Sequence, residues 1–236
     1  MNKTLIPWAD YSINPVKGLC PMDCKDLAGK PYCYARRMYK RFKWNPEITY
    51  DGQWWQPLRR IKAGNKIFIG STFELFHDSV SDEWRERIFK WVKIFGDLTF
   101  IFLTKQPQNL AKWSPFPPNC WVGVSATDQE KMYWAGYELV KVQAKVKFVS
   151  FEPLLDWKTP LKWLTNPLFQ YFKYAGINWI ILGSRTQPVK HPPREWVDEI
   201  ISAADNAGIP VFVKSPLAEY MGINRKEFPI STGLRG

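Results

Sequence analysis

Short apolar runs alternate along the chain with stretches in which apolar residues recur at helical spacing. The run at 66–70 ends at a glycine, and in the stretch after it Trp84, Ile88 and Trp91 fall on one helical face. The same alternation continues as far as residue 213. The predicted strands are 66–70, 99–104, 120–125, 146–151, 177–183 and 209–213, with a first strand within 8–15, and the predicted helices are 82–95, 107–113, 128–140 and 194–207.

This order of elements predicts an α/β protein. Repeated β–α units with continuously apolar strands are typical of a parallel sheet that is covered on both faces. About seven units without a break in composition favour a single domain over 1–236, built as a full or partial (β/α) barrel. An open doubly wound sheet is the alternative. The segment 161–174 is expected to be partly helical and interrupted by Pro167, and the tail at 215–236 to be irregular.

Three of the four cysteines, Cys20, Cys24 and Cys33, lie in one loop at 18–35. Several thiolates that converge on one point are what a soft metal ion or an iron–sulfur cluster requires. The fourth cysteine, Cys120, begins a predicted strand, so we expect it to be a small buried apolar side chain.

Composition narrows the class of protein. With 45% hydrophobic and 23% charged residues the chain is predicted to be globular. The 13 tryptophans either pack in the core or line a cleft where they could stack on a planar ligand. The net charge of +11 favours a polyanionic partner, above all nucleic acid, although solubility alone could explain it. We expect no signal peptide, no membrane span and a cytoplasmic location, where clustered cysteines indicate metal binding or catalysis.

Polar residues follow nearly every predicted strand. In parallel β/α folds the carboxyl ends of the strands carry the functional site, so these residues could form a ring at one mouth of the barrel. Taken singly, each is more typical of a turn or a helix cap. The residues are Ser71, Thr72, Glu74 and His77; Thr104, Lys105 and Gln106; Ser125, Thr127 and Asp128; Ser150 and Glu152; Ser184, Arg185 and Thr186; and Lys214 and Ser215.

Charged residues of this ring have a functional and a structural interpretation. Glu152 follows a strand among apolar neighbours, where a carboxylate either pairs with a cation or holds a hydroxyl or amine of a ligand. Lys105, Lys214 and Arg185 could hold an anionic group or be solvated at the surface. His77 could transfer protons or bind metal, but a lone histidine is more often structural.

The strand, the three-cysteine loop that ends in Tyr-Cys-Tyr-Ala, and the β/α units after it resemble the radical S-adenosylmethionine (SAM) superfamily. Within that superfamily the chain resembles a small family of three-cysteine proteins of phages and bacteria. The stretches that carry the resemblance are 14–20, 32–36, 71–77, 103–107, 121–125, 150–155, 179–183 and 208–214.

The resemblance implies that Cys20, Cys24 and Cys33 bind three irons of a [4Fe–4S] cluster and that the fourth iron binds SAM. An electron from the cluster would then cleave SAM to a deoxyadenosyl radical, which would take a hydrogen atom from the substrate. An electron-donor protein or other reductant is implied as a partner, and no catalytic residue is identified. The implied cofactor-binding residues are Tyr32 near the adenine, and Ser71, Thr72, Glu74, Ser125 and Glu152.

The chain departs from the expected pattern in three respects. Eight residues lie between Cys24 and Cys33 where the superfamily has two, and Gly29 and Pro31 would have to turn this longer loop back. The Gly-Gly-Glu motif expected after the second strand appears only as 70–74. In the small family a second Gly-Gly-Glu motif is expected after the sixth strand. Here that stretch is 183–185, and Arg185 replaces the acid.

Three hypotheses follow. The first is a radical SAM enzyme that repairs or modifies nucleic acid. The second is a zinc-stabilised nucleic-acid-binding protein without radical chemistry, in which His77 could complete the cysteine ligands. The third is a barrel with incidental cysteines that acts as a hydrolase or a binding protein.

Overall fold

Seven parallel strands carry the fold, in a computed structural model that describes residues 3–157 and 167–229. The chain divides into two compact units. The first unit holds residues 1–124 and 141–145, and the second holds 125–140 and 146–236.

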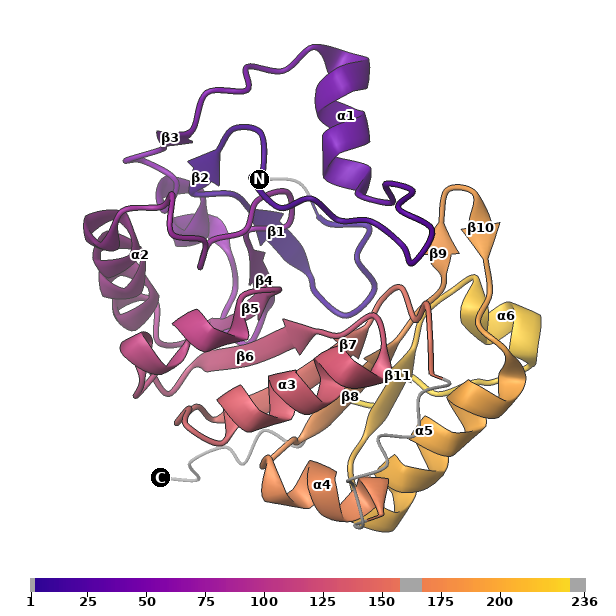
Figure 1. The fold of residues 1–236 in the computed structure, drawn as a ribbon. Coiled ribbons are helices and arrows are strands. Elements are labelled where there is room, and N and C mark those ends of the chain that lie inside the picture. The colour runs from indigo at the N-terminus through magenta and orange to yellow at the C-terminus, as the bar shows by residue number, and fades with distance from the viewer. Residues whose placement is uncertain (1–2, 158–166, 230–236) are drawn as a thin grey trace. The chain divides into compact units, whose positions relative to one another are not determined.

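In the first unit, the order of the strands across the sheet is their order along the chain (Figure 1). Each strand pairs in parallel with the next, with Ile67 opposite Phe100 and Ile101 opposite Trp121. These side chains are at most 5% exposed, which explains why the strands are continuous apolar runs in the sequence. The strands are β1 (Tyr11–Ile13), β4 (Lys66–Ile69), β5 (Thr99–Thr104) and β6 (Cys120–Ser125).

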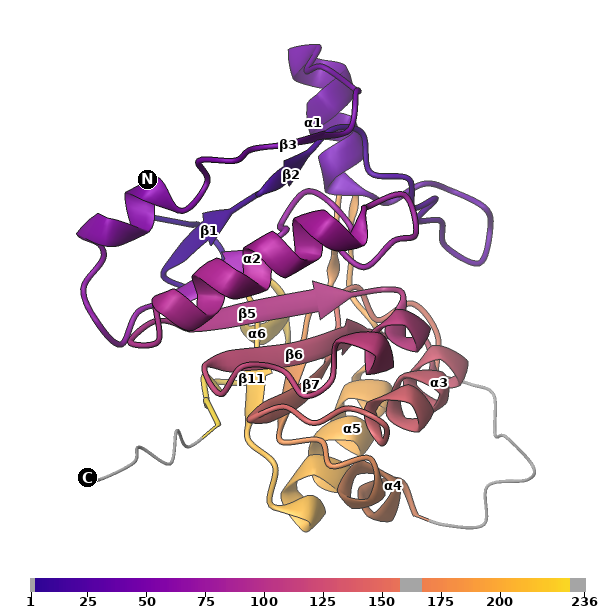
Figure 2. The same ribbon diagram turned by 90° about the vertical axis from the view of Figure 1, so that its left-hand side faces the viewer.

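Helix α2 (Asp82–Ile94) packs against this sheet. Ser81 caps its first turn by accepting a hydrogen bond from the N–H of Trp84. The apolar face is buried, and the ring of Phe89 lies 5.5 Å from the ring of Phe102 on β5. Figure 2 shows the helix running alongside β5.

The other elements of the first unit are short. The helix predicted at 107–113 occurs as two 3-10 turns, η2 (Pro107–Asn109) and η3 (Ala111–Trp113). Helix α1 (Tyr34–Phe42) was not predicted, although Tyr34, Met38 and Phe42 recur on one helical face with basic residues between them, which was the available signal. The remaining elements are β2 (Val16–Lys17), β3 (Thr49–Tyr50) and η1 (Gln56–Arg60).

The second unit continues the β/α pattern with three strands and the helices between them. Helix α4 contacts both α3 and α5, and Figure 1 shows the three helices together. Strand β8 pairs in parallel with β7 and with β11. The elements are α3 (Gln129–Leu139), β7 (Val146–Phe151), α4 (Leu168–Tyr174), β8 (Trp179–Leu182), β9 (Arg185–Thr186), β10 (Val189–Lys190), α5 (Arg194–Ala207), β11 (Val211–Val213) and α6 (Leu217–Met221).

The predicted fold class is confirmed: the chain is an α/β protein with seven parallel strands, a partial (β/α) barrel. That 1–236 forms a single domain stays a prediction. The helical part predicted at 161–166 lies outside the described residues. No helix in the described part of the chain is long and apolar enough to cross a membrane.

The tail at 215–236, expected to be irregular, contains the short helix α6. The buried face of this helix is formed by Leu217, Ala218 and Met221. Their spacing is helical, but a pattern of only five residues is too short to be recognised in the sequence. Gly222 ends the helix in the left-handed conformation, with φ at 67°.

Asn119 joins α2 to the start of β6, and its loss should destabilise the first unit. Its Nδ2 donates to the carbonyls of Val92, Phe95 and Leu98 at 2.9–3.1 Å. We expect Asn119→Ala to lower the free energy of unfolding by about 1–3 kcal/mol, because partly buried carbonyls lose their donor. Urea denaturation measures the change, and Asn65→Ala is the matched control, since Asn65 is a surface residue whose Nδ2 donates to the carbonyl of Lys62.

Candidate functional site

The long loop between Cys24 and Cys33 folds back on itself. Asp26 organises the turn, because its Oδ1 accepts the N–H groups of Ala28 and Lys30 at 3.0 and 2.8 Å. Lys25 and Pro31 then form an antiparallel bridge, and the N–H of Tyr32 donates to the carbonyl of Cys24 at 3.0 Å. The eight residues between the two cysteines therefore return the chain to its starting point.

The three thiols of the loop lie close enough to influence one another. The S–H of Cys24 donates a hydrogen bond to the sulfur of Cys33. This bond is the main reason why the pKa of Cys33 falls to about 5, and N–H groups of Ala35 and Arg36 and the charge of Lys105 add to the effect. The same bond, together with burial, raises the pKa of Cys24.

Cys20 lies deeper than the other two cysteines. Burial raises its pKa, which the N–H groups of Met22 and Glu74 partly offset by donating to its sulfur. All four cysteines are free thiols. Cys120 is fully buried on β6, as predicted for a small apolar side chain.

Side chains from neighbouring elements hold the cysteine loop in place. Arg36 on α1 donates to the carbonyls of Cys20 and Met22, at 2.9 and 3.0 Å. The amide of Gln106, which follows β5, donates to the sulfur of Met22 at 3.3 Å. The loop is thus fixed to α1 and to the carboxyl end of β5.

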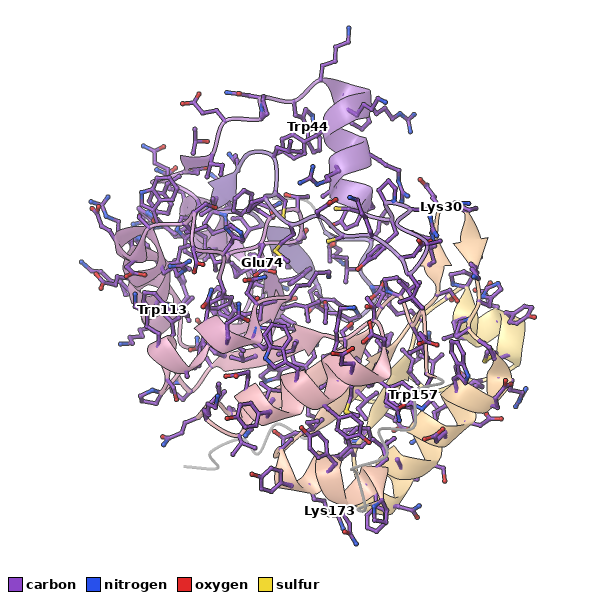
Figure 3. The ribbon with its side chains drawn as sticks, viewed as in Figure 1. Lys30, Trp44, Glu74, Trp113, Trp157 and Lys173 are labelled. Atoms are coloured by element: carbon purple, nitrogen blue, oxygen red, sulfur yellow. The ribbon has the colours of Figure 1, made fainter. Side chains whose placement is uncertain are left out.

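Glu74 connects the carboxyl ends of β4 and β5. Its carboxylate accepts hydrogen bonds from the hydroxyl of Thr104 at 2.5 Å and from the N–H groups of Lys105 and Phe76 at 2.8 and 3.2 Å. The residue is 6% exposed and lies inside the unit (Figure 3), and burial raises its pKa. Since its own N–H also faces Cys20, Glu74 positions the cysteine loop relative to the sheet.

Ser71 and Thr72 follow β4 and lie beside Asn14, which follows β1. The side-chain oxygen of Asn14 accepts the N–H of Thr72 at 3.1 Å and lies 3.3 Å from the hydroxyl of Ser71. The hydroxyl of Tyr34, in the first turn of α1, donates to the carbonyl of Ser71. Cys20, Cys24, Cys33, Tyr32, Ser71, Thr72 and Glu74 therefore all belong to the first unit.

Ser125 and Glu152 belong to the second unit. Glu152 pairs with Lys214, which follows β11. A Cβ on Gly183 would stand 3.0 Å from the Cγ of Glu152, so glycine at 183 gives this side chain its room. The loops after β6 and β7 meet where the N–H of Leu155 donates to the carbonyl of Thr127 at 2.7 Å.

One polar atom near Glu152 has no hydrogen-bond partner among the described residues. The hydroxyl of Ser150, near the end of β7, is fully buried and unpaired. Such an atom costs free energy unless a ligand or water completes it. It is the feature of the second unit that best fits a binding site.

Sequence reasoning missed two residues of the site, Arg36 and Asn14. Both lie within the stretches that carry the family resemblance, which was the available signal. Gln106 was predicted only as one member of the ring of polar residues after strands. His77 instead makes local contacts: its Nδ1 accepts the N–H of Ser79 at 3.1 Å, and it is not among the residues gathered at the cysteine loop.

Within residues 3–157 and 167–229, no three His, Cys, Asp or Glu side chains are arranged to share one metal ion. An iron–sulfur cluster differs from a single ion because each thiolate binds its own iron. The donor set fits such a cluster in its chemistry: three neighbouring thiols, N–H donors directed at two of the sulfurs, and a nearby lysine.

A family model described as "Protein of unknown function (DUF5131)" matches residues 3–225. The chain belongs to this family. No curated protein matches the sequence of this DUF5131 member.

Among solved structures, the DUF5131 chain is similar to a double mutant of spore photoproduct lyase with bound AdoMet and dinucleoside spore photoproduct. The TM-score is 0.48 and the sequence identity is 11%. The match covers 87% of the DUF5131 chain and 64% of the lyase chain, so it spans less than two thirds of that protein.

Gly18 should be indispensable to the cysteine loop. Its φ is +124°, and a Cβ would lie 2.5 Å from the carbonyl oxygen of Glu47, which is backbone and cannot turn away. We expect Gly18→Ala to lower the free energy of unfolding by about 2 kcal/mol or more. Urea denaturation is the measurement. Gly52→Ala is the control because a Cβ there meets nothing within 4 Å, and equal losses in the two variants would contradict the steric argument.

The lowered pKa of Cys33 predicts unusual reactivity in metal-free protein. Because the thiolate is the nucleophile, the rate of alkylation of Cys33 by iodoacetamide should reach half its maximum near pH 5. Cys24→Ala removes the hydrogen-bond donor and should move this midpoint upward. Mass spectrometry of the alkylated peptides over a pH series tests this, with buried Cys120 as the unreactive internal control. An unchanged midpoint in Cys24→Ala would refute the assigned cause.

Proposed function

We propose that this protein is a radical SAM enzyme in which Cys20, Cys24 and Cys33 hold a [4Fe–4S] cluster. The observation that carries the proposal is the closed turn at 25–31, which returns Cys33 to Cys24 although eight residues separate them. The proximity of Cys33 to Cys24 supports a three-thiolate site in spite of the longer loop. When bound, the cluster would supply the electron that cleaves SAM to a deoxyadenosyl radical.

The residues around the loop suit this role. Hydrogen bonds to cluster sulfurs and nearby charge tune the reduction potential of an iron–sulfur site. Here the N–H groups of Ala35 and Arg36 point at the sulfur of Cys33, and Lys105 acts on both Cys24 and Cys33. The backbone N–H of Lys105 donates to the Glu74 carboxylate, and this bond fixes the backbone from which the Lys105 side chain extends.

The residues proposed to bind SAM are Tyr32, Ser71, Thr72, Glu74, Ser125 and Glu152. Glu74 is expected to act by positioning, because its carboxylate already accepts three hydrogen bonds. Ser71 and Thr72 present polar groups beside Asn14. Near Glu152, the unpaired hydroxyl of Ser150 could form a hydrogen bond with a polar group of the ligand.

An electron-donor protein or other reductant and a cytoplasmic location belong to the same proposal. Nucleic acid is the proposed substrate class, since the net charge of +11 favours a polyanion. Repair or modification of a base is the reaction that we propose.

Loading with iron under anaerobic conditions tests the cluster directly. We expect the wild-type protein to bind about four iron atoms per chain, as a [4Fe–4S] cluster requires, and to release deoxyadenosine from SAM after reduction. Single Cys20→Ala, Cys24→Ala and Cys33→Ala variants should lose most of the iron and nearly all deoxyadenosine formation. Iron and sulfide assays and chromatography of the SAM products give the readouts.

Cys120→Ala is the matched control, because it also removes one thiol but from a buried position on β6. It should keep both iron and deoxyadenosine formation. Equal iron in the wild-type protein and a triple Cys20, Cys24, Cys33 alanine variant would refute the proposal. One zinc per chain and no iron after strictly anaerobic preparation would favour the zinc-stabilised alternative instead.

A further inference from the structure

The net positive charge of the chain lies almost entirely in the first unit. That unit has 21 Lys and Arg residues against 11 Asp and Glu residues, a net charge of +10. The second unit has 12 against 11, a net charge of +1. A uniform excess kept for solubility would be spread over both units, so the asymmetry indicates a polyanionic partner of the first unit.

Within the first unit, basic residues and exposed aromatic rings coincide at the end of α1. Between residues 34 and 46 there are five basic residues and no acidic one. The five consecutive residues Lys40, Arg41, Phe42, Lys43 and Trp44 are all exposed. We call these five residues the α1 surface.

The two rings of the α1 surface are displayed to solvent in an ordered arrangement. Phe42 and Trp44 are 48% and 43% exposed, and they stack on each other with centroids 5.6 Å apart and planes 21° apart. The guanidinium of Arg41 lies over the ring of Phe42, 5.3 Å from its centroid. Large rings flanked by cations in this way form the kind of platform on which unpaired bases stack while phosphates meet the charges.

Tyr39 connects the two rings to the cysteine loop. Trp44, labelled beside α1 in Figure 3, packs edge-on against Tyr39 with centroids 5.2 Å apart. The hydroxyl of Tyr39 in turn accepts the N–H of Gly18 at 2.8 Å, two residues before Cys20. The α1 surface is therefore pre-organised, which lowers the entropic cost of binding.

We propose that the α1 surface binds single-stranded nucleic acid. A single strand fits better than a duplex because a duplex hides the faces of its bases from the two rings. An anionic membrane fits less well, because two rings are a small apolar area to insert among lipid headgroups. Binding itself is independent of any cofactor. That a strand bound here is delivered to the cysteine loop rests on the proposed function.

Fluorescence anisotropy with labelled 15-nucleotide oligothymidylate and a matched RNA tests the proposal on metal-free full-length protein. The charge variant Lys40→Gln, Arg41→Gln, Lys43→Gln should weaken binding about ten- to a hundredfold at 50 mM salt. It should also reduce the slope of log affinity against log salt by about 2, since each single-strand phosphate contact contributes about 0.7. Trp44→Ala should weaken binding at least about fivefold, and Trp44→Phe should restore most of it.

A matched charge control separates the α1 surface from the general field of the unit. Arg60→Gln, Lys62→Gln, Lys90→Gln removes three other exposed cations from the first unit and should change the affinity less than threefold. Equal weakening by the two triple variants would overturn the proposal in favour of bulk charge. No binding at 25 mM salt, or equal binding of a 15-base-pair duplex, would also overturn it, as would binding to phosphatidylserine vesicles with none to oligonucleotide.

Iron content and deoxyadenosine formation are measured on the same variants, so that the two proposals can fail separately. Normal iron content and deoxyadenosine formation without oligonucleotide binding would refute only the proposal for the α1 surface. If the protein takes up no iron but its oligonucleotide binding depends on the α1 surface, this inference holds and the proposed function is refuted.

Discussion

The turn centred on Asp26 is the constraint on which the cysteine loop depends. Ordering each residue of a loop costs about 1–2 kcal/mol of backbone entropy, so eight residues between Cys24 and Cys33 need compensating bonds of their own. Two N–H groups donate to the Asp26 carboxylate, and the N–H of Asp26 donates to the carbonyl of Lys30 at 2.9 Å. Since these bonds are local, the loop closes without help from the sheet, and the two thiols meet.

The loop acquires its place relative to the sheet through a small number of polar side chains. Glu74, Arg36 and Gln106 each join it to a different element: β4, α1 and the end of β5. Two of these four contacts are made to backbone carbonyls of the loop, and the other two to the sulfur atoms of Cys20 and Met22. The positions of the thiols thus depend on the carboxyl edge of the sheet, which is where α/β folds place their functional residues.

The strands could be predicted from the sequence because burial on both faces makes them continuous apolar runs, as 99–104 and 146–151 show. The cysteine cluster could be predicted because its members are close in sequence. Helix α1 was also predictable in principle, since Tyr34, Met38 and Phe42 recur at helical spacing between basic residues, but the sequence prediction omitted it. The contacts of Asn14 and Arg36 could not be predicted, because they join segments whose proximity only the folded chain creates.

Charge in this protein acts locally, and its total explains little. Charges separated by more than about 10 Å are largely screened at ordinary ionic strength. The pKa of Cys33 is lowered by its own neighbours, with Lys105 as the cation that contributes. By the same reasoning, a phosphate at the α1 surface would respond to Lys40, Arg41 and Lys43 rather than to the net charge of +11. The first unit's excess of positive charge therefore matters through where its cations lie: Lys105 near the cysteine sulfurs, and three cations within the five consecutive residues that carry the two exposed rings.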